Sequence, residues 1–237
     1  MLETILKSAF EWRNQLGLLN ESEALRIFYG PGESNHPELQ HLSADLYKDH
    51  LWLTAWKKIS SKVLDEACEI MTRILPFKIE AIVLMDRSVV ASEAEVVTLR
   101  GTSRSGRFAV KEFGVKYLVQ MEKTKHPGLF LDHSPLRFWL QQTQKNKTVL
   151  NLFSYTGSLS VAAAHGGARK VTTLDLSKHT IEWAKENWAN SGFSPEAGDF
   201  IYGDTFEWLP KFKKRGEQFD TILCDPPSFS RSKNGVF

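Results

Sequence analysis

A short polar turn in the second half of this sequence has residue types that could bind a nucleoside. The turn, Ser154-Tyr155-Thr156-Gly157, stands between an apolar run of strand-favouring residues, 148–153, and a helix-compatible run, 158–165. The start of a helix leaves backbone N–H groups without partners, and these can meet a ligand. Gly157 allows the backbone to bend and to approach that ligand, because glycine has no Cβ. We therefore expect a ligand-binding turn here.

An acid follows the next apolar run. Asp175 ends the strand expected at 170–174, where its carboxylate can accept hydrogen bonds from ribose hydroxyls. The dinucleotide pattern G-x-G-x-x-G needs three glycines, and this turn offers one, so NAD and FAD are disfavoured. A ligand with a ribose but no pyrophosphate fits better, and S-adenosylmethionine is the commonest such ligand. A plain β-α-β crossover without a ligand is the simpler alternative.

Two more acids follow apolar runs and are expected at the same edge of a sheet. Asp204 comes after the short strand expected at 201–202, a place where an acid commonly meets the adenine amino group of a bound nucleoside. Asp225 comes after the strand expected at 219–224, which we expect to be buried. Ligands of open α/β sheets bind beyond the carboxyl ends of the strands. The three acids therefore predict a single site.

The stretch Asp225-Pro226-Pro227-Ser228-Phe229 could hold a planar base. Asp225 supplies a hydrogen-bond acceptor, the two prolines stiffen the backbone and remove N–H donors, and Phe229 offers a face for stacking. Methyl transfer from a sulfonium is an in-line displacement, so the protein's main task is to hold the donor methyl group and the acceptor lone pair in line. A proline-rich turn after an ordinary strand is the simpler alternative.

The two cysteines leave one further chemistry open. Cys224 could attack a pyrimidine ring, as cytosine-5 methylation requires. We favour a packing role, because a thiol inside an apolar run behaves as a small hydrophobic group. Cys68 has no close cysteine partner and no metal-type spacing, so neither a disulfide framework nor a zinc site is indicated.

Composition limits the class of protein. The chain has 237 residues, 42% of them hydrophobic, which can bury a full core in one large domain or two small ones. No apolar run is long enough to span a membrane, and the first residues are typical of an amphipathic helix. We therefore expect a cytoplasmic protein. The oligomeric state is not given by the sequence.

The net charge is only +2, but the bases are unevenly distributed. We call residues 100–125 the basic segment, because this range contains seven basic residues and two acidic residues. A second cluster of bases follows at 211–215. Such local excess could hold a phosphate backbone, although a solvated surface explains it equally well.

Two domains are expected from the order of the elements. Residues 1–122 read as a small α+β domain with a possible RNA-binding role, and residues 123–237 as the domain that carries the acids. The expected helices of the first part are 2–19 and 60–74, and its expected strands are 25–29, 42–48, 51–56, 78–85, 95–100, 107–113 and 115–121. The second part is expected to have helices at 137–144, 177–190 and 206–212 besides the elements named above.

The second part resembles a known family, the class I S-adenosylmethionine-dependent ribosomal RNA methyltransferases of bacteria. The likeness is closest to the guanine-N7 methylating half of the bifunctional large-subunit enzyme, and the cytosine-5 large-subunit enzymes are cousins. It is dense over 128–232 and thinner over 1–127, where RIFYGPG and the order of elements are similar to that family's preceding α+β domain. The stretches that carry it are GLFLDHSPLR, NLFSYTGSLSVAAAHGGARKVTTLDLSKHTIEWAKENWANSGF and FDTILCDPPSFSRSK.

The resemblance implies a class I methyltransferase (Rossmann-like) α/β sheet and a set of site residues. Contacts to S-adenosylmethionine are implied for Asp132, His133, Phe153, Ser154, Tyr155, Thr156, Gly157, Asp175, Leu176 and Asp204. The target base is implied to lie against Asp225, Pro226, Pro227 and Phe229. The family has an arginine directly after its D-H or D-Q pair, whereas this sequence has Ser134 there and Arg137 further on.

The implied function is methyl transfer to guanine N7 of large-subunit ribosomal RNA. Guanine N7 carries an in-plane lone pair, so no base has to remove a proton, which fits a positioning acid without a histidine dyad. An exocyclic amine also fits. The alternatives are cytosine-5 methylation of ribosomal RNA and, from another class, a non-catalytic RNA-binding protein with an incomplete methyltransferase fold.

The resemblance also predicts a truncated sheet. A complete sheet of this class has seven strands, whereas the second part of the sequence offers four. We therefore expect either a fragment or a sheet completed by another copy.

Overall fold

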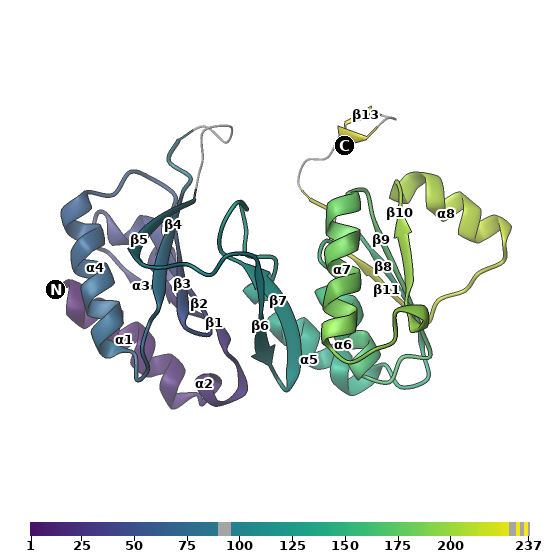
Figure 1. Cartoon of the computed structure of the whole chain (residues 1–237), viewed down its shortest axis with the longest axis horizontal. Coiled ribbons are helices and arrows are strands. Elements are labelled where there is room, and N and C mark those ends of the chain that lie inside the picture. The colour runs from purple at the N-terminus through teal and green to yellow at the C-terminus, as the bar shows by residue number, and fades with distance from the viewer. Residues whose placement is uncertain (90–95, 228–230, 233–234, 237) are drawn as a thin grey trace. The chain divides into compact units, whose positions relative to one another are not determined.

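The chain folds into two compact units, each with its own sheet. The computed structural model describes residues 1–89, 96–227, 231–232 and 235–236 (Figure 1). The first unit comprises Met1–Gly114 and Val119–Pro127, and the second comprises Val115–Leu118 and Gly128–Phe237. Phe229, one of the residues implied to hold the target base, lies outside the described residues.

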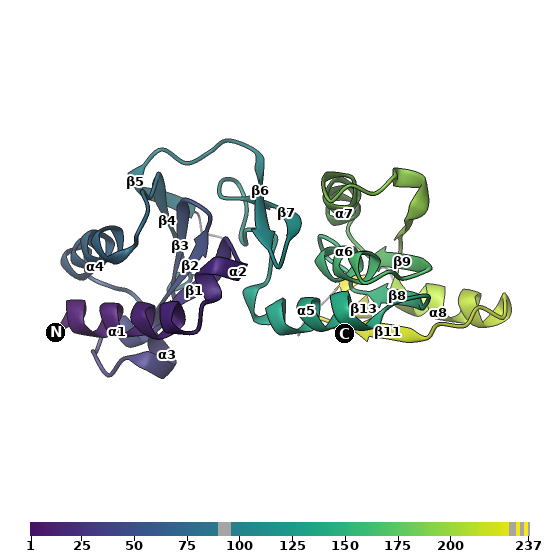
Figure 2. The same ribbon diagram turned by 90° about the horizontal axis from the view of Figure 1, so that it is seen from below.

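The first unit is a five-stranded sheet with two helices on one face. The strand order is β1-β2-β3-β4-β5, and only β3 and β4 run parallel. A parallel pair needs a crossover, which the helix α4 (Ser61–Ile74) supplies. It packs against α1 (Leu2–Gln15) on the same side of the sheet (Figures 1 and 2). The strands are β1 (Ala24–Tyr29), β2 (Leu42–Tyr47), β3 (His50–Ala55), β4 (Ala81–Asp86) and β5 (Val96–Gly101).

The core of this unit follows from alternation along the strands. In β2, Leu42, Ala44 and Leu46 face the helices and join the apolar stripe of α4. Ser60 caps α4, because its side chain accepts a hydrogen bond from the Val63 N–H. Short helices α2 (Leu18–Glu21), α3 (Gly30–Glu33) and η1 (Leu39–His41) connect the elements, and β6 (Arg107–Glu112) pairs with β7 (Val115–Gln120).

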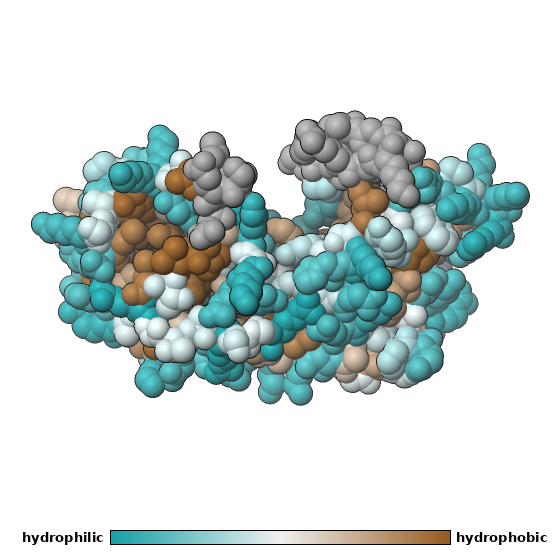
Figure 3. All heavy atoms as spheres, turned by 45° about the horizontal axis from the view of Figure 1, so that its top comes forward, coloured by the Kyte–Doolittle hydropathy of each residue, from teal (hydrophilic) through white to brown (hydrophobic). Residues whose placement is uncertain are grey.

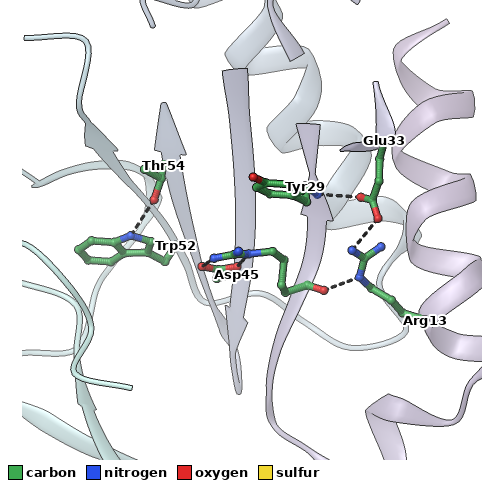
Figure 4. A network of polar contacts seen from close by, with 7 residues as sticks. Arg13, Tyr29, Glu33, Asp45, Trp52 and Thr54 are labelled. Carbon is green, nitrogen blue, oxygen red and sulfur yellow. Dashed lines mark hydrogen bonds and ion pairs between the residues drawn. The ribbon is translucent and has the colours of Figure 1, made fainter. Parts of the chain in front are cut away.

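A polar network ties α1 to the sheet of the first unit (Figure 4). The buried guanidinium of Arg13 lies 2.7 Å from Glu33 and also donates to the carbonyl oxygen of Arg26. The side chain of Arg26 in turn makes two hydrogen bonds to the Asp45 carboxylate, at 2.7 and 3.1 Å. Paired in this way, the buried charge of Arg13 costs far less than it would alone. The network fixes how α1 lies on the sheet.

The second unit is a four-stranded parallel sheet, with strand order β10-β9-β8-β11. Its strands are β8 (Thr148–Leu152), β9 (Lys170–Asp175), β10 (Asp199–Tyr202) and β11 (Thr221–Cys224). Its helices are η2 (Leu131–His133), α5 (Ser134–Thr143), α6 (Ser158–His165), α7 (Lys178–Asn190), η3 (Pro195–Ala197) and α8 (Thr205–Lys214). A short ladder of β12 (Arg231–Ser232) and β13 (Gly235–Val236) follows.

The strand order creates a switch point beside β8. The chain moves outward from β8 to β9 and β10, with α6 and α7 on one face of the sheet, and then returns to β11 with α8 on the other face (Figure 1). Strands β8 and β11 are therefore neighbours whose connections leave in opposite directions. Ligands of open parallel sheets bind at the carboxyl ends of such a pair. The fold alone thus places a site after residues 152 and 224.

The outer surface is mixed. Hydrophobic residues reach the surface of the first unit (Figure 3), and its exposed large hydrophobic side chains include Trp56, Val89 and Val97. Among the residues that the structure describes, no helix is long and apolar enough to cross a membrane.

Candidate active site

A cavity of about 330 Å³ lies at the switch point of the second unit. Its walls come from the segments that follow β8, β9 and β11, and from the segment before α5. The lining residues are Phe130, His133, Asn151, Phe153, Ser154, Tyr155, Ser158, Leu159, Asp175, Leu176, Ser177, Thr180, Asp225, Pro226 and Pro227. Apolar rings and a few convergent polar groups are the usual make-up of a small-molecule site.

The turn after β8 is held in an uncommon backbone conformation. Phe153 and Tyr155 have positive φ angles, 53° and 51°, which non-glycine residues rarely adopt. The Tyr155 N–H donates to Asp175 Oδ2 at 2.8 Å, so the acid at the end of β9 fixes the turn. Such strain is commonly found at ligand-binding turns. The turn presents its side of the cavity in a preset shape.

The Tyr155 side chain lines this cavity with an uncharged hydroxyl group. Burial, and then the negative charge of Asp175, raise the pKa of the Tyr155 hydroxyl to about 12. The ring of Phe130 lies 5.3 Å from the Tyr155 ring, centroid to centroid. The pair encloses one side of the cavity without adding charge.

Asp175 has more internal partners than its sequence position indicates. Besides the Tyr155 N–H, its carboxylate accepts the Ser177 N–H at 2.8 Å and the Thr180 hydroxyl at 2.9 Å, both at Oδ1. Each carboxylate oxygen accepts about two hydrogen bonds, so Oδ2 keeps room for one more. The Thr180 hydroxyl also lies 2.9 Å from the Ser177 carbonyl oxygen and can turn to it. Asp175 can therefore still accept a ribose hydroxyl.

A buried polar chain lies under the cavity. The Asn151 amide donates to Ser160 Oγ at 2.9 Å, and the Thr173 hydroxyl donates to the same oxygen at 2.9 Å. This fixes the carboxamide of Asn151, which lines the cavity. Nearby, Ser154 Oγ is buried and has no hydrogen-bond partner among the described residues. A polar ligand group would satisfy it.

Two residues of the turn, Thr156 and Gly157, contact neighbouring segments of the protein. Gly157 has φ +74°, and an added Cβ would lie 2.7 Å from the Ala184 Cβ, so glycine is needed for packing against α7. The Thr156 hydroxyl donates to the Gly128 carbonyl oxygen, and Asn187 donates to the Thr156 carbonyl oxygen at 2.8 Å. Neither Gly157 nor Thr156 lines the cavity, although the resemblance implies that both contact the ligand.

Asp204 and Asp132 also lie apart from the lining. The Asp204 carboxylate caps α8 by accepting the Phe206 N–H at 2.9 Å, and its side chain is buried. Asp132 is exposed on η2. The cavity brings together the other described residues implied by the resemblance: His133, Phe153, Ser154, Tyr155, Asp175, Leu176, Asp225, Pro226 and Pro227.

The acid after β11 has a histidine partner. His133 Nε2 lies 3.3 Å from Asp225 Oδ2, with the His133 side chain 24% exposed and that of Asp225 62% exposed. The sequence predicts a positioning acid without a histidine dyad, and the structure places His133 beside that acid. The two residues are 92 positions apart in the chain, and only the fold brings them together.

Cys224 is exposed, which corrects the expectation of a buried thiol. In the described part of the sheet, β11 pairs only with β8, so alternate side chains such as Ile222 reach solvent. Cys68 is buried on the inner face of α4.

Several lining residues cannot be recognised from the sequence. Asn151 lies within an apolar strand, and Ser158 and Thr180 are common small polar residues, so nothing local marks them. Phe130 stands out only as part of an apolar run before a polar pair. Among the described residues, no group of His, Cys, Asp and Glu could hold a metal ion.

Comparison with known proteins points in the same direction. The family model described as S-adenosylmethionine-dependent methyltransferase matches residues 25–236. A crystal structure of SMU.776 complexed with SAH superposes with a TM-score of 0.85 at 26% identity, over 99% of this chain and 60% of that one. The predicted class I methyltransferase sheet is confirmed by this match.

Curated relatives are similar over most of the chain. The "Ribosomal RNA large subunit methyltransferase K/L" of Pseudomonas fluorescens is 34% identical over 100% of this chain and 30% of its own length. The "Ribosomal RNA large subunit methyltransferase K" of Neisseria meningitidis is 34% identical over 96% of this chain and 63% of its own length. The chain thus spans from 30% to 63% of the length of these relatives.

Proposed function

Because this chain belongs to the S-adenosylmethionine-dependent methyltransferase family, we propose that it takes part in methylating a base of large-subunit ribosomal RNA. The names of its relatives support this substrate class. We further propose guanine N7 as the target atom, from the resemblance of the stretches around residues 130, 154 and 225.

The cavity at the switch point carries the proposal. We call the strained turn after β8 together with Asp175 the donor wall, and Asp225-Pro226-Pro227 the acceptor wall, and both line this cavity. A donor held by the first wall and a base held by the second would meet inside one cavity. Holding two reactants in line is the chief contribution that a protein can make to a methyl transfer.

The lining residues fit S-adenosylmethionine. Asp175 Oδ2 would accept a ribose hydroxyl, and the side chains of Phe153 and Leu176 offer apolar surface for the adenine. Ser154 Oγ and the Asn151 carboxamide would serve polar groups of the amino-acid end. We propose that Asp204, whose carboxylate caps α8, contributes to adenine selection from outside the lining. When bound, the cofactor supplies an activated methyl group.

The acceptor wall suits a planar nitrogen base. Pro226 and Pro227 lack N–H donors, so they cannot compete for the acceptor atom. Asp225 would hold the edge of the base, and a cation forms on guanine when N7 is methylated. A carboxylate beside it stabilises that charge.

Cytosine-5 methylation is the second candidate, because the exposed thiol of Cys224 directly precedes Asp225. Its weakness is that Cys224 does not line the cavity. Loss of cytosine methylation in Cys224→Ser would favour it. Unchanged guanine methylation in the same variant would favour our proposal.

The test is mass spectrometry of ribosomal RNA nucleosides. RNA from cells lacking the gene is compared with RNA from the parent cells, and then incubated with the 237-residue chain and methyl-labelled S-adenosylmethionine. We expect one 7-methylguanosine to disappear from the large-subunit RNA and to return with the label. An unaltered set of methylated nucleosides would refute the proposal.

A further inference from the structure

The pair of His133 and Asp225 has a geometry that the expected site does not use. Asp225 stands at the carboxyl end of β11 with a largely exposed side chain, which would be free to rotate if it had no partner. The imidazole of His133 reaches it from η2, with Nε2 3.3 Å from Oδ2. This distance allows a hydrogen bond through a small movement.

His133 itself is firmly held. It precedes α5, whose buried Arg137 donates to the Phe130 carbonyl oxygen at 2.8 Å. The Phe130 ring lies 6.0 Å from the His133 ring, centroid to centroid, and packs on Tyr155. The segment 130–133 is therefore anchored to the donor wall and to α5. A fixed His133 imidazole beside the exposed Asp225 carboxylate restricts the rotation of that carboxylate.

We propose that His133 is a positioning residue for Asp225: its imidazole N–H donates to the carboxylate and fixes it against the target base. This inference rests on the proposed function and assigns His133 to the acceptor half of the site. The resemblance implies instead that His133 closes the cofactor site.

The charge matters because of what methyl transfer does. The lone pair of the target nitrogen forms the N–C bond while the pair of the C–S bond leaves with sulfur, so the positive charge passes from sulfur to the base. An unneutralised Asp225 carboxylate stabilises that charge.

Two variants separate positioning from other roles. His133→Gln keeps an N–H donor but cannot gain a proton, and His133→Ala removes the donor. We expect His133→Gln, which keeps a donor, to retain kcat within about threefold of the wild-type value. His133→Ala should lower kcat by about tenfold to a hundredfold at every pH, with little change in KM for S-adenosylmethionine.

Three results would overturn the inference. They are an unaltered kcat in His133→Ala, a kcat in His133→Gln that is as low as in His133→Ala, and a raised KM for S-adenosylmethionine with unaltered kcat. The last would return His133 to the cofactor.

A readout without RNA keeps the inference separate from the proposed function. In the full chain labelled with ¹⁵N-histidine, we expect the Nε2 resonance of His133 to shift in Asp225→Asn. It should stay in place in Glu182→Gln, which alters an exposed acid of α7 in the same unit. If the Nε2 resonance does not shift in Asp225→Asn, the pairing is refuted even if methylation is observed. If the Nε2 resonance shifts but no methylation is found, only the proposed function is contradicted.

Discussion

Asp175 connects the turn, the helix α7 and the proposed ribose site through one carboxylate. It accepts hydrogen bonds from Tyr155, Ser177 and Thr180, yet Oδ2 retains room for a ligand hydroxyl. A residue with this many protein partners shapes the site as well as contacting the ligand. The two contributions can be separated by substitution.

Asp175→Ala should weaken the binding of S-adenosylhomocysteine by about 1.5–3 kcal/mol, which is roughly tenfold to more than a hundredfold in Kd, because the ribose loses a charged acceptor. Isothermal titration calorimetry measures this. The matched control is Thr180→Val, which removes one internal hydrogen bond and keeps the carboxylate, and should change Kd by less than about threefold. Unchanged affinity in Asp175→Ala would remove Asp175 from the site.

The two thiols should differ sharply in reactivity. Burial raises the pKa of the Cys68 thiol to about 11, so Cys68 stays protonated at about pH 8, whereas Cys224 is exposed. Alkylation by iodoacetamide, followed by mass spectrometry, should modify Cys224 alone in the folded chain and both thiols after unfolding. Rapid alkylation of folded Cys224→Ser would contradict this placement.

The raised pKa also makes stability depend on pH. The folded state favours the neutral Cys68 thiol, so this contribution to the free energy of unfolding is complete below the ordinary thiol pKa. It is lost as the pH rises through about 11.

At the scale of elements, the start of α6 depends on one glycine. Gly157 combines a positive φ with a close approach to Ala184, whereas Gly216 has φ +67° and nothing within 4 Å of an added Cβ. Gly157→Ala should lower the free energy of unfolding by about 1–3 kcal/mol more than Gly216→Ala, because only the first adds a clash. Urea unfolding measures both, and equal losses would show that the packing against α7 is not limiting.

Elements with strong patterns could be predicted from sequence. The alternation in 42–47, the Ser60 cap of α4 and the glycine break after α6 each locate an element within a residue or two. Local patterns do not show which residues are neighbours across the sheet. The exposure of Cys224 follows from the position of β11 at the edge of the sheet as far as the structure describes it, and the pairing of His133 with Asp225 follows from the switch point. Asp204 is predicted to contact the ligand, and the structure shows that its side chain caps α8.

At the scale of the whole molecule, some bases of the basic segment form ion pairs with acidic side chains of the protein. Arg100 pairs with Asp65 and Glu69, and Arg104 pairs with Asp49. Lys111 and Lys123 are exposed. We propose that the first unit binds RNA, and these exposed lysines are the better candidates for contacts to phosphate.

Neutralising both, Lys111→Gln with Lys123→Gln, should weaken RNA binding and make it less dependent on salt. The slope of log K against log salt concentration should fall by about 0.7–0.9 for each phosphate that the protein no longer neutralises. Fluorescence anisotropy with a large-subunit ribosomal RNA fragment measures it. Lys7→Gln, on α1 and paired with Glu11, is the control. An unchanged slope in the double variant would place the RNA elsewhere.

The central claim is that the cavity between Asp175 and Asp225 holds the methyl donor. Calorimetric titration of S-adenosylhomocysteine into the 237-residue chain tests it most directly. We predict saturable binding to one site per chain, which competes with S-adenosylmethionine. No binding of either compound at concentrations up to about 1 mM, the upper end of common KM values, would contradict the account.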